Sequence, residues 1–359
     1  MDNSFGEFLK IKIYGTSHCK YLKATIKNFP KDIKINMDEI NHFLYLRKSH
    51  SNLTTPRLEE DEVIFESGIN NNITTGETIS FRIYNKNTKS SDYVKGVCRP
   101  SHADYVGYLK YGDQYDYKGG GFFSGRLSVL LVVIGALCKQ VLNSLNVNVA
   151  SHIKELHGIL DDEFDYNKIN ETINKLNKKE FAVINNNVAL KMKEEILKAK
   201  EDNDSVGGVI ETIAINVPIC LGEPYFNSFE AYLSHLLFSL GGIKGIEFGD
   251  GFSFKDKKGS EVADELKIIN NNVKILANHN GGINGGITNG NPIIFRCVVK
   301  PTSSISKPLN TINYLTNENI TLNLKGRHDP CILTRIRVVI DAITYITILD
   351  FYLRLLKKG

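Results

Sequence analysis

The irregular order of strand-like and helix-like segments limits the folds that are open to this chain. Short runs of alternating or continuous apolar residues predict β-strands at residues 9–13, 63–65, 79–83, 208–217 and 293–299. Longer apolar or helically spaced segments predict α-helices at residues 127–145, 188–202, 229–240 and 332–356. Strands and helices do not alternate regularly, and no repeat recurs at a fixed period. We therefore expect an α+β fold with antiparallel sheets rather than a doubly wound parallel sheet.

The composition is that of a globular protein. The 359 residues are 42% hydrophobic and 23% charged, which excludes long disorder and allows one large domain or two ordinary ones. The net charge of +4 is too small to indicate a nucleic-acid partner. A nucleic-acid-binding function would rest only on the lysine-rich surface, where lysines and glutamates are interleaved. This pattern favours a solvated surface.

Cysteine usage and the apolar stretches favour a soluble protein of a reducing compartment. The six cysteines form no C-x-x-C pair, so we expect free thiols and no bound metal. Residues 1–12 lack the continuous apolar segment of a signal peptide. The longest apolar stretch, residues 127–138, is interrupted by Ser128 and Gly135 and is shorter than the roughly 20 residues of a membrane span. These features predict a cytoplasmic protein without a membrane partner.

Two histidines stand in polar segments that interrupt apolar surroundings. His18 ends the loop 15–18 after the first predicted strand and could act as a general acid near neutral pH. An ordinary capped or surface histidine is the alternative. His102 is followed two positions later by Asp104, a carboxylate that can fix the tautomer and pKa of an imidazole. Side chains at positions i and i+2 often diverge, so this pairing stays open.

A run of three glycines precedes the first long apolar helix. Residues 119–121 would let backbone N–H groups approach an anion, and the following helix N-terminus favours negative charge. Arg126 adds a planar guanidinium that suits phosphate or carboxylate. The spacing matches neither of the two common nucleotide-binding fingerprints, and a plain glycine hinge is the alternative.

Two further polar segments lie towards the C-terminus. Residues 300–304, Lys-Pro-Thr-Ser-Ser, offer one cation and three hydroxyl groups to a phosphate. Residues 327–329 place arginine, histidine and aspartate just before the last apolar helix. A solvated helix cap is the alternative for the second segment. The polar segments together predict a site that binds an anionic, phosphorylated, carboxylate-bearing ligand and moves protons near it.

In this order, these segments resemble the chorismate synthase family, and the resemblance covers nearly the whole chain. The matching motifs are residues 4–6, 15–18, 54–57, 74–76, 90–93, 99–105, 110–112, 123–126, 204–208, 222–224, 244–247, 280–286, 300–305 and 326–331. The resemblance implies a single domain, residues 1–359, built as a β-α-β sandwich in which antiparallel sheets enclose helices. It also implies a homotetramer that binds a small phosphoester and no nucleic acid.

The resemblance implies a lyase of the shikimate pathway, and thus of aromatic amino acid biosynthesis. The reaction is the anti-1,4-elimination of phosphate from 5-enolpyruvylshikimate 3-phosphate, which gives chorismate. The family requires reduced FMN (FMNH2), which is thought to lend an electron transiently, while the protein supplies binding, orientation and protons. NADPH would serve only as a reductant of the flavin. We see no dinucleotide fingerprint, so we expect reduction by an external source.

The resemblance assigns roles by matched position. His18 would assist departure of the phosphate as an acid, His102 would protonate or stabilise the reduced flavin, and Asp329 would help relay the substrate proton. The matched substrate-binding positions are Ser17, Arg47, Ser124 and Arg126. The matched FMN-binding positions are Phe122, Phe123, Ser124, Gly241, Gly242, Gly285, Lys300, Pro301, Thr302, Ser303, Ser304 and Arg327.

Several positions depart from the family pattern. Where the family usually has Glu or Gly, this chain has Thr16, Cys19 and Ser101. Phe122 stands where His or Arg is common, and a usual pair of arginines is mostly missing, with Arg47 as a substitute shifted by one residue. A catalytically weakened paralogue that still binds FMN and a phosphoester is therefore the alternative. The presence of all three proton-handling residues favours an active enzyme.

Overall fold

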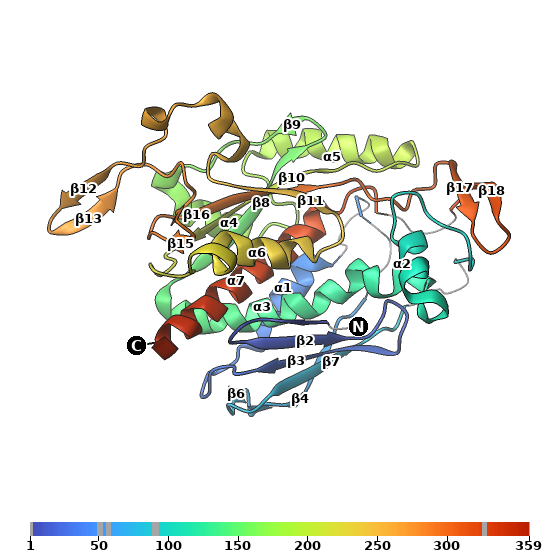
Figure 1. The fold of residues 1–359 in the computed structure, drawn as a ribbon, viewed down its shortest axis with the longest axis horizontal. Helices are drawn as coiled ribbons and strands as arrows, with labels where there is room; N and C mark the ends of the chain where they lie inside the picture. Colours follow the sequence, from blue (N-terminus) through green and yellow to red (C-terminus); the bar gives the residue numbers. More distant parts are fainter. Residues whose placement is uncertain (1–2, 49–52, 55–58, 88–92, 325–328, 359) are drawn as a thin grey trace.

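The structure, a computed structural model, describes residues 3–48, 53–54, 59–87, 93–324 and 329–358. Two five-stranded sheets lie on either side of a layer of helices (Figure 1). All strand pairs within these two sheets are antiparallel. This arrangement confirms the predicted α+β fold, a β-α-β sandwich with antiparallel sheets that enclose helices.

The first sheet is formed by the N-terminal part of the chain. Its order is β1 (Ser4–Phe5), β2 (Lys10–Tyr14), β3 (Tyr21–Lys27), β7 (Ile79–Tyr84) and β4 (Val63–Ser67). In β3, the alternate residues Leu22, Ala24 and Ile26 are buried in the main core, whereas Tyr21 and Lys27 are exposed. The alternation arises because successive side chains of a strand point to opposite faces. One face of this sheet therefore covers the helices.

The second sheet covers the helices from the other side. Its order is β11 (Ile243–Phe248), β16 (Ile293–Val299), β10 (Gly208–Ile215), β8 (Asn148–Leu156) and β9 (Ile159–Leu160). A second apolar cluster contains Ile213 and Ile294 from the sheet, together with Ile173 and Leu176 of helix α4 (Ile169–Leu176). Apolar residues therefore pack on both faces of this sheet, which explains the nearly continuous apolar sequence of β16.

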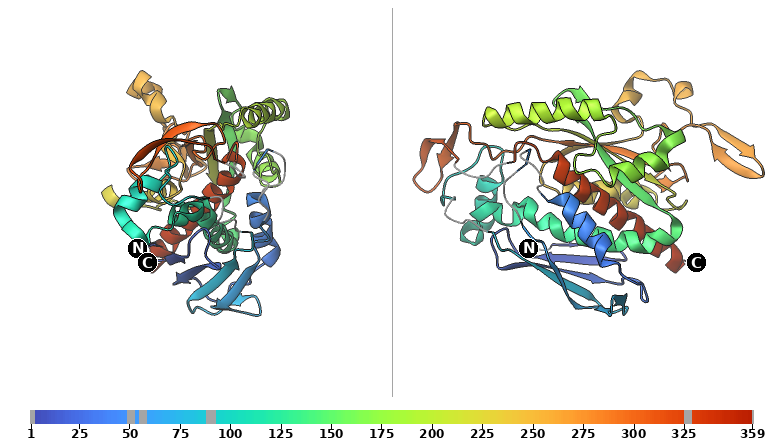
Figure 2. Two further views of the ribbon diagram at one scale, coloured as in Figure 1. Left: turned by 90° about the vertical axis from the view of Figure 1, so that its right-hand side faces the viewer. Right: turned by 180° about the vertical axis from the view of Figure 1, so that it is seen from behind.

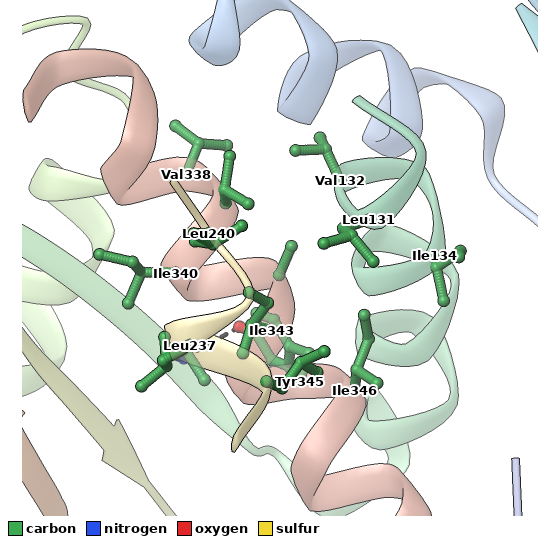
Figure 3. Close-up of a cluster of buried hydrophobic side chains, with 14 of the residues drawn as sticks. Leu131, Val132, Ile134, Leu237, Leu240, Val338, Ile340, Ile343, Tyr345 and Ile346 are labelled. Carbon is green, nitrogen blue, oxygen red and sulfur yellow. Dashed lines mark hydrogen bonds between the residues drawn. The ribbon is translucent and has the colours of Figure 1, made fainter. Parts of the chain in front are cut away.

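The middle layer contains α1 (Met37–Arg47), α3 (Ser128–Leu142), α6 (Phe229–Phe238) and α7 (Leu333–Lys358). Helices α3 and α7 approach closely at Gly135, where an added Cβ would lie 2.3 Å from the Cβ of Ala342. This close approach explains a glycine inside an otherwise apolar helix. Figure 3 shows Leu131 and Ile134 of α3 near Ile343 and Ile346 of α7.

One segment, residues 125–145, is long and apolar enough to cross a membrane by length and composition alone. Its length therefore does not exclude a membrane span, contrary to the argument from the shorter run of residues 127–138. Burial gives the better criterion, because 67% of its apolar window is buried inside the protein. The segment includes α3, which packs against α7 in the core (Figure 3).

The remaining elements lie at the periphery. Two further helices are α2 (Asp104–Tyr111) and α5 (Asn186–Glu201). The short strands form the hairpins β5 (Ile69–Asn70) with β6 (Ile73–Thr74), β12 (Leu266–Ile269) with β13 (Asn272–Ile275), β14 (Ile283–Asn284) with β15 (Ile287–Thr288), and β17 (Leu309–Asn313) with β18 (Glu318–Leu322). The 3-10 turns are η2 (Gly112–Gln114), η3 (Lys118–Phe123), η4 (Gly125–Leu127), η5 (Asn143–Leu145), η6 (Tyr166–Lys168), η7 (Tyr225–Asn227), η8 (Gly251–Asp256) and η9 (Gly259–Glu261). The view from behind places α2 and β17–β18 at one end of the molecule and β12–β13 at the other (Figure 2).

The strands and helices predicted from sequence are present, with ends that differ by a few residues. The prediction overlooked β3, although Leu22, Ala24 and Ile26 carry a period of two. It also missed β8, α1 and the short helix α4. Helices α1 and α4 are rich in polar residues, and only a few apolar side chains attach them to the core.

Candidate functional site

The loop between β2 and β3 packs directly onto the turn of three glycines. The backbone N–H of Ser17 donates a hydrogen bond to the carbonyl oxygen of Gly121 over 3.1 Å. A Cβ added to Gly119 would lie 2.6 Å from both Ser17 Oγ and His18 Nε2. The contact leaves no room for a side chain at position 119.

His102 lies against the next residue of the same turn. A Cβ on Gly120 would lie 3.2 Å from His102 Nε2. All three glycines adopt positive φ angles of 59°, 80° and 52°, a region that favours glycine. Two imidazoles from different parts of the sequence thus flank consecutive residues of one turn. Their close approach, rather than a plain hinge, explains Gly119 and Gly120, and the carbonyl oxygen of Asp116, 2.1 Å from a Cβ on Gly121, explains the third glycine.

Asp104 connects His102 to Arg99. The carboxylate accepts hydrogen bonds from Arg99 Nε to Oδ2 and from Arg99 Nη2 to Oδ1, both at 2.8 Å. His102 Nδ1 lies 2.8 Å from Asp104 Oδ1 and 3.1 Å from Arg99 Nη2. The hydroxyl of Tyr115 donates a further hydrogen bond to Asp104 Oδ1 over 2.9 Å. The predicted pairing of His102 with Asp104 is therefore present.

These contacts decide the charges in the cluster. Burial by itself would raise the pKa of Asp104, but the hydrogen bonds and charges of Arg99 and His102 outweigh burial and hold that pKa well below its usual range. Burial and then the charge of Asp104 raise the pKa of Tyr115. At neutral pH the carboxylate is therefore ionised, and the phenol keeps its proton as a donor.

The segment 300–304 borders this cluster. Lys300 Nζ donates to the carbonyl oxygen of Ser101 over 2.6 Å, and the Lys300 backbone N–H donates to that of Gly242 over 2.9 Å. Arg99 Nη1 donates to Ser304 Oγ over 3.1 Å. Ser101 has a φ of 59°, which is costly for a residue with a side chain. This backbone conformation gives a physical reason for the glycine that the family resemblance expects at position 101.

Two arginines share one buried carboxylate on the other side of the loop. Arg126 Nη1 donates to Asp61 Oδ1 over 2.5 Å, and Arg47 Nη1 lies 3.7 Å from Asp61 Oδ2. Ser124 Oγ donates to Ser17 Oγ over 3.1 Å and joins this arginine cluster to the glycine turn. All three charged side chains are buried. Arg47 therefore holds a guanidinium beside Arg126, and its role as a substitute for a family arginine stays a prediction.

Two buried polar atoms at the site have no hydrogen-bond partner among the residues that the structure describes. They are Arg126 Nη2 and Thr302 Oγ1. An unpaired buried donor or acceptor costs about 1–3 kcal/mol, and more when it is charged. A ligand with acceptor oxygens beside each atom would remove this cost.

A model of the family described as chorismate synthase matches residues 9–353. The chain belongs to the chorismate synthase family. Chorismate synthase of Dehalococcoides mccartyi is 39% identical over 359 residues, which are 99% of this chain and 97% of that protein. The enzyme of Methanosphaera stadtmanae is 39% identical over 98% of this chain and 96% of its own length. A crystal structure titled chorismate synthase has a TM-score of 0.78 and 24% identity over 98% of this chain and 94% of that chain, a likeness in fold.

For this member of the chorismate synthase family, the fold brings most of the predicted site residues together. Ser17, His18 and His102 pack on the glycine turn. A Cβ on Gly241 would lie 3.7 Å from the carbonyl oxygen of Phe123. Phe122 is half-buried at the end of the turn and Pro301 is exposed at the edge of the cluster. Ser303 is half-buried between Thr302 and Ser304.

Asp329 joins the site from the side of the arginines. Arg335 Nη1 donates to Asp329 Oδ2 over 2.6 Å, and Arg335 Nε donates to the carbonyl oxygen of Arg47 over 3.3 Å. The described connection of Asp329 to the other predicted residues thus runs through Arg335. A direct role for Asp329 in relaying the substrate proton, close to His18 and His102, stays a prediction.

One predicted FMN-binding residue, Gly285, has no described contact with the site, and another cannot be placed. Gly285 lies in the exposed turn between β14 and β15, at the end of the molecule away from α2 (Figure 1). A Cβ on Gly285 would meet nothing within 4 Å. Arg327 lies outside the described residues.

The sequence analysis missed four residues that shape the site: Asp61, Asn85, Arg99 and Arg335. Asp61 lies in the acidic stretch 59–62, which is typical of a solvated surface, yet it is buried between two arginines. Asn85 accepts from Arg126 Nε over 2.9 Å and follows β7 without a distinguishing pattern. Arg99 stood within a noted motif, and its spacing to Asp104 was a usable signal.

Proposed function

We propose that the protein is a chorismate synthase, a carbon–oxygen lyase that acts on a phosphate ester and depends on FMNH2. It would eliminate phosphate from 5-enolpyruvylshikimate 3-phosphate in an anti-1,4 manner and release chorismate. This reaction belongs to the shikimate pathway of aromatic amino acid biosynthesis. The observation that carries the proposal is the packing of His18 and His102 on consecutive glycines of one turn, within a chain of this family.

The arginine cluster supports an anionic substrate. Arg126 Nη2 is buried and lacks a described partner, while Arg126 Nη1 is fixed by Asp61. A guanidinium held in this way presents a donor to phosphate or carboxylate without losing further side-chain entropy. Ser17 and Ser124, joined by a hydrogen bond, would add hydroxyl donors beside it. Positive charge placed in advance stabilises the charge that develops on a departing phosphate.

The residues around the glycine turn fit a flavin phosphate. Thr302 Oγ1 is a buried hydroxyl without a described partner, and Lys300 supplies a cation in the same segment. The turn itself packs against His18 and His102 and holds both imidazoles at this site. The residues that would hold FMN are Phe122, Phe123, Ser124, Gly241, Gly242, Lys300, Pro301, Thr302, Ser303 and Ser304. When bound, reduced FMN supplies the transient electron that the elimination needs.

The protein's own groups would handle the protons. His18 would act as an acid towards the departing phosphate oxygen. His102 would hold a proton beside the flavin. Asp329, oriented by its hydrogen bond from Arg335, would help relay the proton lost from the substrate. In the net reaction, the electron pair of the broken C–H bond would form one double bond, the electrons of the existing ring double bond would shift to form the second, and phosphate would leave with the electrons of the C–O bond.

An anaerobic assay tests this proposal. Purified protein with chemically reduced FMN and the phosphoester should release phosphate and form chorismate in equal amounts. Folded protein that binds FMN without releasing phosphate would contradict the proposal and favour the catalytically weakened paralogue. NADPH alone should leave the spectrum of oxidised FMN unchanged, since we propose external reduction. Bleaching by NADPH would show that the protein reduces its own flavin.

We also propose a cytoplasmic homotetramer. The β12–β13 hairpin projects from the body and carries the opposed pairs Leu266–Ile275 and Ile268–Val273 on one face (Figure 1). Leu266 and Ile268 are 70% and 75% exposed, and a lone hairpin is marginal in water. This apolar face supports contact with another copy. Analytical ultracentrifugation should give four chains per particle, and Ile268→Asp should lower that number. A monomeric wild-type protein would contradict the assembly.

A further inference from the structure

We propose that Asn85 is a positioning residue that holds the guanidinium of Arg126 against the loop 15–19 and leaves Nη2 of Arg126 as a fixed donor for an anionic oxygen. The inference rests on the proposed function, in which Arg126 binds the anionic substrate. It adds the residue that orients this guanidinium and connects it to the loop that carries Ser17 and His18.

The side-chain amide of Asn85 forms hydrogen bonds at both of its ends. Its Oδ1 accepts from Arg126 Nε over 2.9 Å, and its Nδ2 donates to the carbonyl oxygen of Cys19 over 2.8 Å. A longer contact of 3.4 Å joins Nδ2 to the carbonyl oxygen of Ser17. The guanidinium can only donate and the carbonyl oxygens can only accept, so these partners fix the orientation of the amide. Asn85 therefore connects Arg126 to the loop through hydrogen bonds of defined direction.

The backbone of Asn85 is itself anchored to the first sheet. Asn85 follows β7, and its N–H donates to the carbonyl oxygen of Lys20 over 3.1 Å. This bond continues the pairing of β7 with β3, in which Tyr84 lies opposite Tyr21. The amide thus extends from the end of a paired strand, and a group on such an element is placed more precisely than one on a free loop.

A second contact prevents the guanidinium of Arg126 from turning. Its Nη1 donates to Asp61 Oδ1 over 2.5 Å, and the side chains of Arg126 and Asp61 are only 5% and 1% exposed. Asp61 stands between the exposed residues Glu60 and Glu62, yet its own carboxylate is buried. Because the guanidinium is planar, contacts at Nε and at Nη1 also fix the position of Nη2.

The third nitrogen of this guanidinium is left for a ligand. Nη2 of Arg126 is buried and has no hydrogen-bond partner in the part of the chain that the structure describes. A buried charged donor without an acceptor is costly, so the site favours an anionic oxygen at this atom. Ser124 Oγ accepts from the Arg126 N–H over 3.3 Å and donates to Ser17 Oγ over 3.1 Å. Hydroxyl groups of the proposed substrate site therefore lie beside the same arginine.

Solid-state NMR of protein labelled with ¹³C,¹⁵N-arginine tests this orientation without flavin, substrate or turnover. The Arg126 signals are those that disappear in Arg126→Lys. In the wild-type protein, Nη1 and Nη2 should give two separate signals, because the contacts with Asn85 and Asp61 slow the rotation of the guanidinium. Asn85→Leu removes both hydrogen bonds of the amide, and exchange between the two signals should become about 10-fold faster or more. A single averaged signal in the wild-type protein, or an equal exchange rate in folded Asn85→Leu, would overturn the proposal.

Titration calorimetry with 5-enolpyruvylshikimate 3-phosphate tests whether Asn85 acts through Arg126. Asn85→Leu should raise the dissociation constant by about 10-fold in the wild-type background. In the Arg126→Lys background the same change should raise it by less than about 2-fold, because the group that Asn85 orients is already lost. Equal factors in the two backgrounds would overturn the proposal.

The matched control is Asn177→Leu. The side chain of Asn177 is also half-buried, and its Nδ2 donates to a backbone carbonyl oxygen, that of Val149 in β8, over 3.0 Å. This change should alter neither the exchange between the Nη signals of Arg126 nor the dissociation constant. Effects equal to those of Asn85→Leu would overturn the proposal, because they would not depend on contact with Arg126.

The two measurements separate this inference from the proposed function. Protein that binds the phosphoester with the expected dependence on Asn85, but forms no chorismate, would defeat the proposed reaction and support the inference. Separate Nη signals in a wild-type protein that binds neither the phosphoester nor inorganic phosphate would overturn the inference, because Arg126 would then serve only the fold.

Discussion

Two clusters in the part of the chain that the structure describes combine a histidine and an arginine with one or two carboxylates, and they hold the histidine in different contacts. The first, which we call the site cluster, contains Arg99, His102 and Asp104. Nδ1 of this imidazole lies 3.1 Å from the donor Arg99 Nη2 and 2.8 Å from Asp104 Oδ1, and Nε2 lies against Gly120. The side chain of His102 is 17% exposed, so a ligand in the site could reach it.

The second, which we call the sheet cluster, contains His152, Asp161, Glu211 and Arg296. His152, Glu211 and Arg296 occupy directly paired positions on β8, β10 and β16. His152 Nδ1 lies 2.7 Å from Asp161 Oδ2, and Nε2 lies 3.0 Å from Glu211 Oε2. The imidazole is completely buried. Burial alone would lower the pKa of His152, but its hydrogen bonds to the two carboxylates outweigh burial and raise it.

The difference shows that buried charge alone does not identify a catalytic histidine. When both ring nitrogens are bound to carboxylates, the imidazole stays charged and serves as a cross-link between strands. When one nitrogen faces a turn of glycines, the same side chain can exchange a proton. Whether a ring nitrogen remains accessible to a ligand therefore distinguishes a catalytic histidine from a structural one better than the types of the neighbouring residues do.

The largest expected effect is on turnover in the site cluster. His102→Ala should lower kcat by about 10²- to 10⁴-fold, because a positioned proton-transfer group is lost, with little change in the free energy of unfolding. Anaerobic kinetics and urea denaturation measure the two quantities. His157→Ala, at an exposed surface histidine, is the control and should change neither. Full turnover by His102→Ala would mean that His102 is not catalytic, and the site cluster would then not differ from the sheet cluster in function.

The sheet cluster should respond in stability instead. His152→Ala leaves Asp161 and Glu211 without their shared cation, and breaking a buried pair in this way costs about 3–5 kcal/mol. Urea denaturation should show this loss, while kcat per folded molecule stays near the wild-type value. The exposed His42→Ala serves as control. A stability within about 0.5 kcal/mol of the wild type would mean that the sheet cluster is not a structural cross-link.

A further buried carboxylate, Asp341, sharpens the comparison through the pH dependence of stability. Asp341 of α7 accepts from Ser151 Oγ over 2.5 Å, and Arg337 lies 3.7 Å away. Burial raises the pKa of Asp341 to about 6 from an ordinary value of 3.8. Between these values the folded state binds more protons than the unfolded state. Asp341 therefore stabilises the fold less as pH rises from about 4 to about 6, by roughly 3 kcal/mol at most.

Asp341→Asn should flatten this part of the stability curve, because the amide does not titrate. Thermal unfolding of both proteins between about pH 4 and pH 7 measures the difference. A parallel pH dependence in the wild type and in Asp341→Asn would show that groups other than Asp341 cause the slope.

Arg126→Lys tests the binding side of the site. Lysine cannot hold Asp61 and Asn85 while offering a further donor, so the apparent KM should rise by about 10- to 100-fold, which corresponds to about 1.5–3 kcal/mol. Steady-state kinetics measure KM and kcat separately. Arg82→Lys, at a partly exposed surface pair with Glu66, is the control. An unchanged KM would argue against Arg126 as a substrate ligand.

The smallest effect is expected at a solvated pair. Lys175→Ala removes an i,i+4 contact with Glu171, in which both side chains are more than half exposed. The free energy of unfolding should change by at most about 0.5 kcal/mol. A loss of unfolding free energy comparable to that of His152→Ala would mean that solvent exposure does not decide how much an ion pair contributes to stability.

Much of the fold could be predicted, because apolar periodicity is a local signal. Long apolar segments, which are stable only when buried, predict β16 and α7. Helix α4 has too few apolar residues for the sequence to predict it. The residues that are joined at the site include His18 and His102, which motifs had singled out. Asp61 was not predicted, because an acidic stretch resembles solvated surface until two arginines are brought against it.

The sequence by itself determined the family, the α+β class and the identities of the polar segments, since these depend on residue types and their order along the chain. Only the tertiary structure decided which nitrogen of His102 faces the glycine turn, which carboxylate holds Arg47 and Arg126, and why His152 is locked between strands. Such pairings join residues that are far apart in the chain, and their energies depend on distance and burial, which no local pattern encodes.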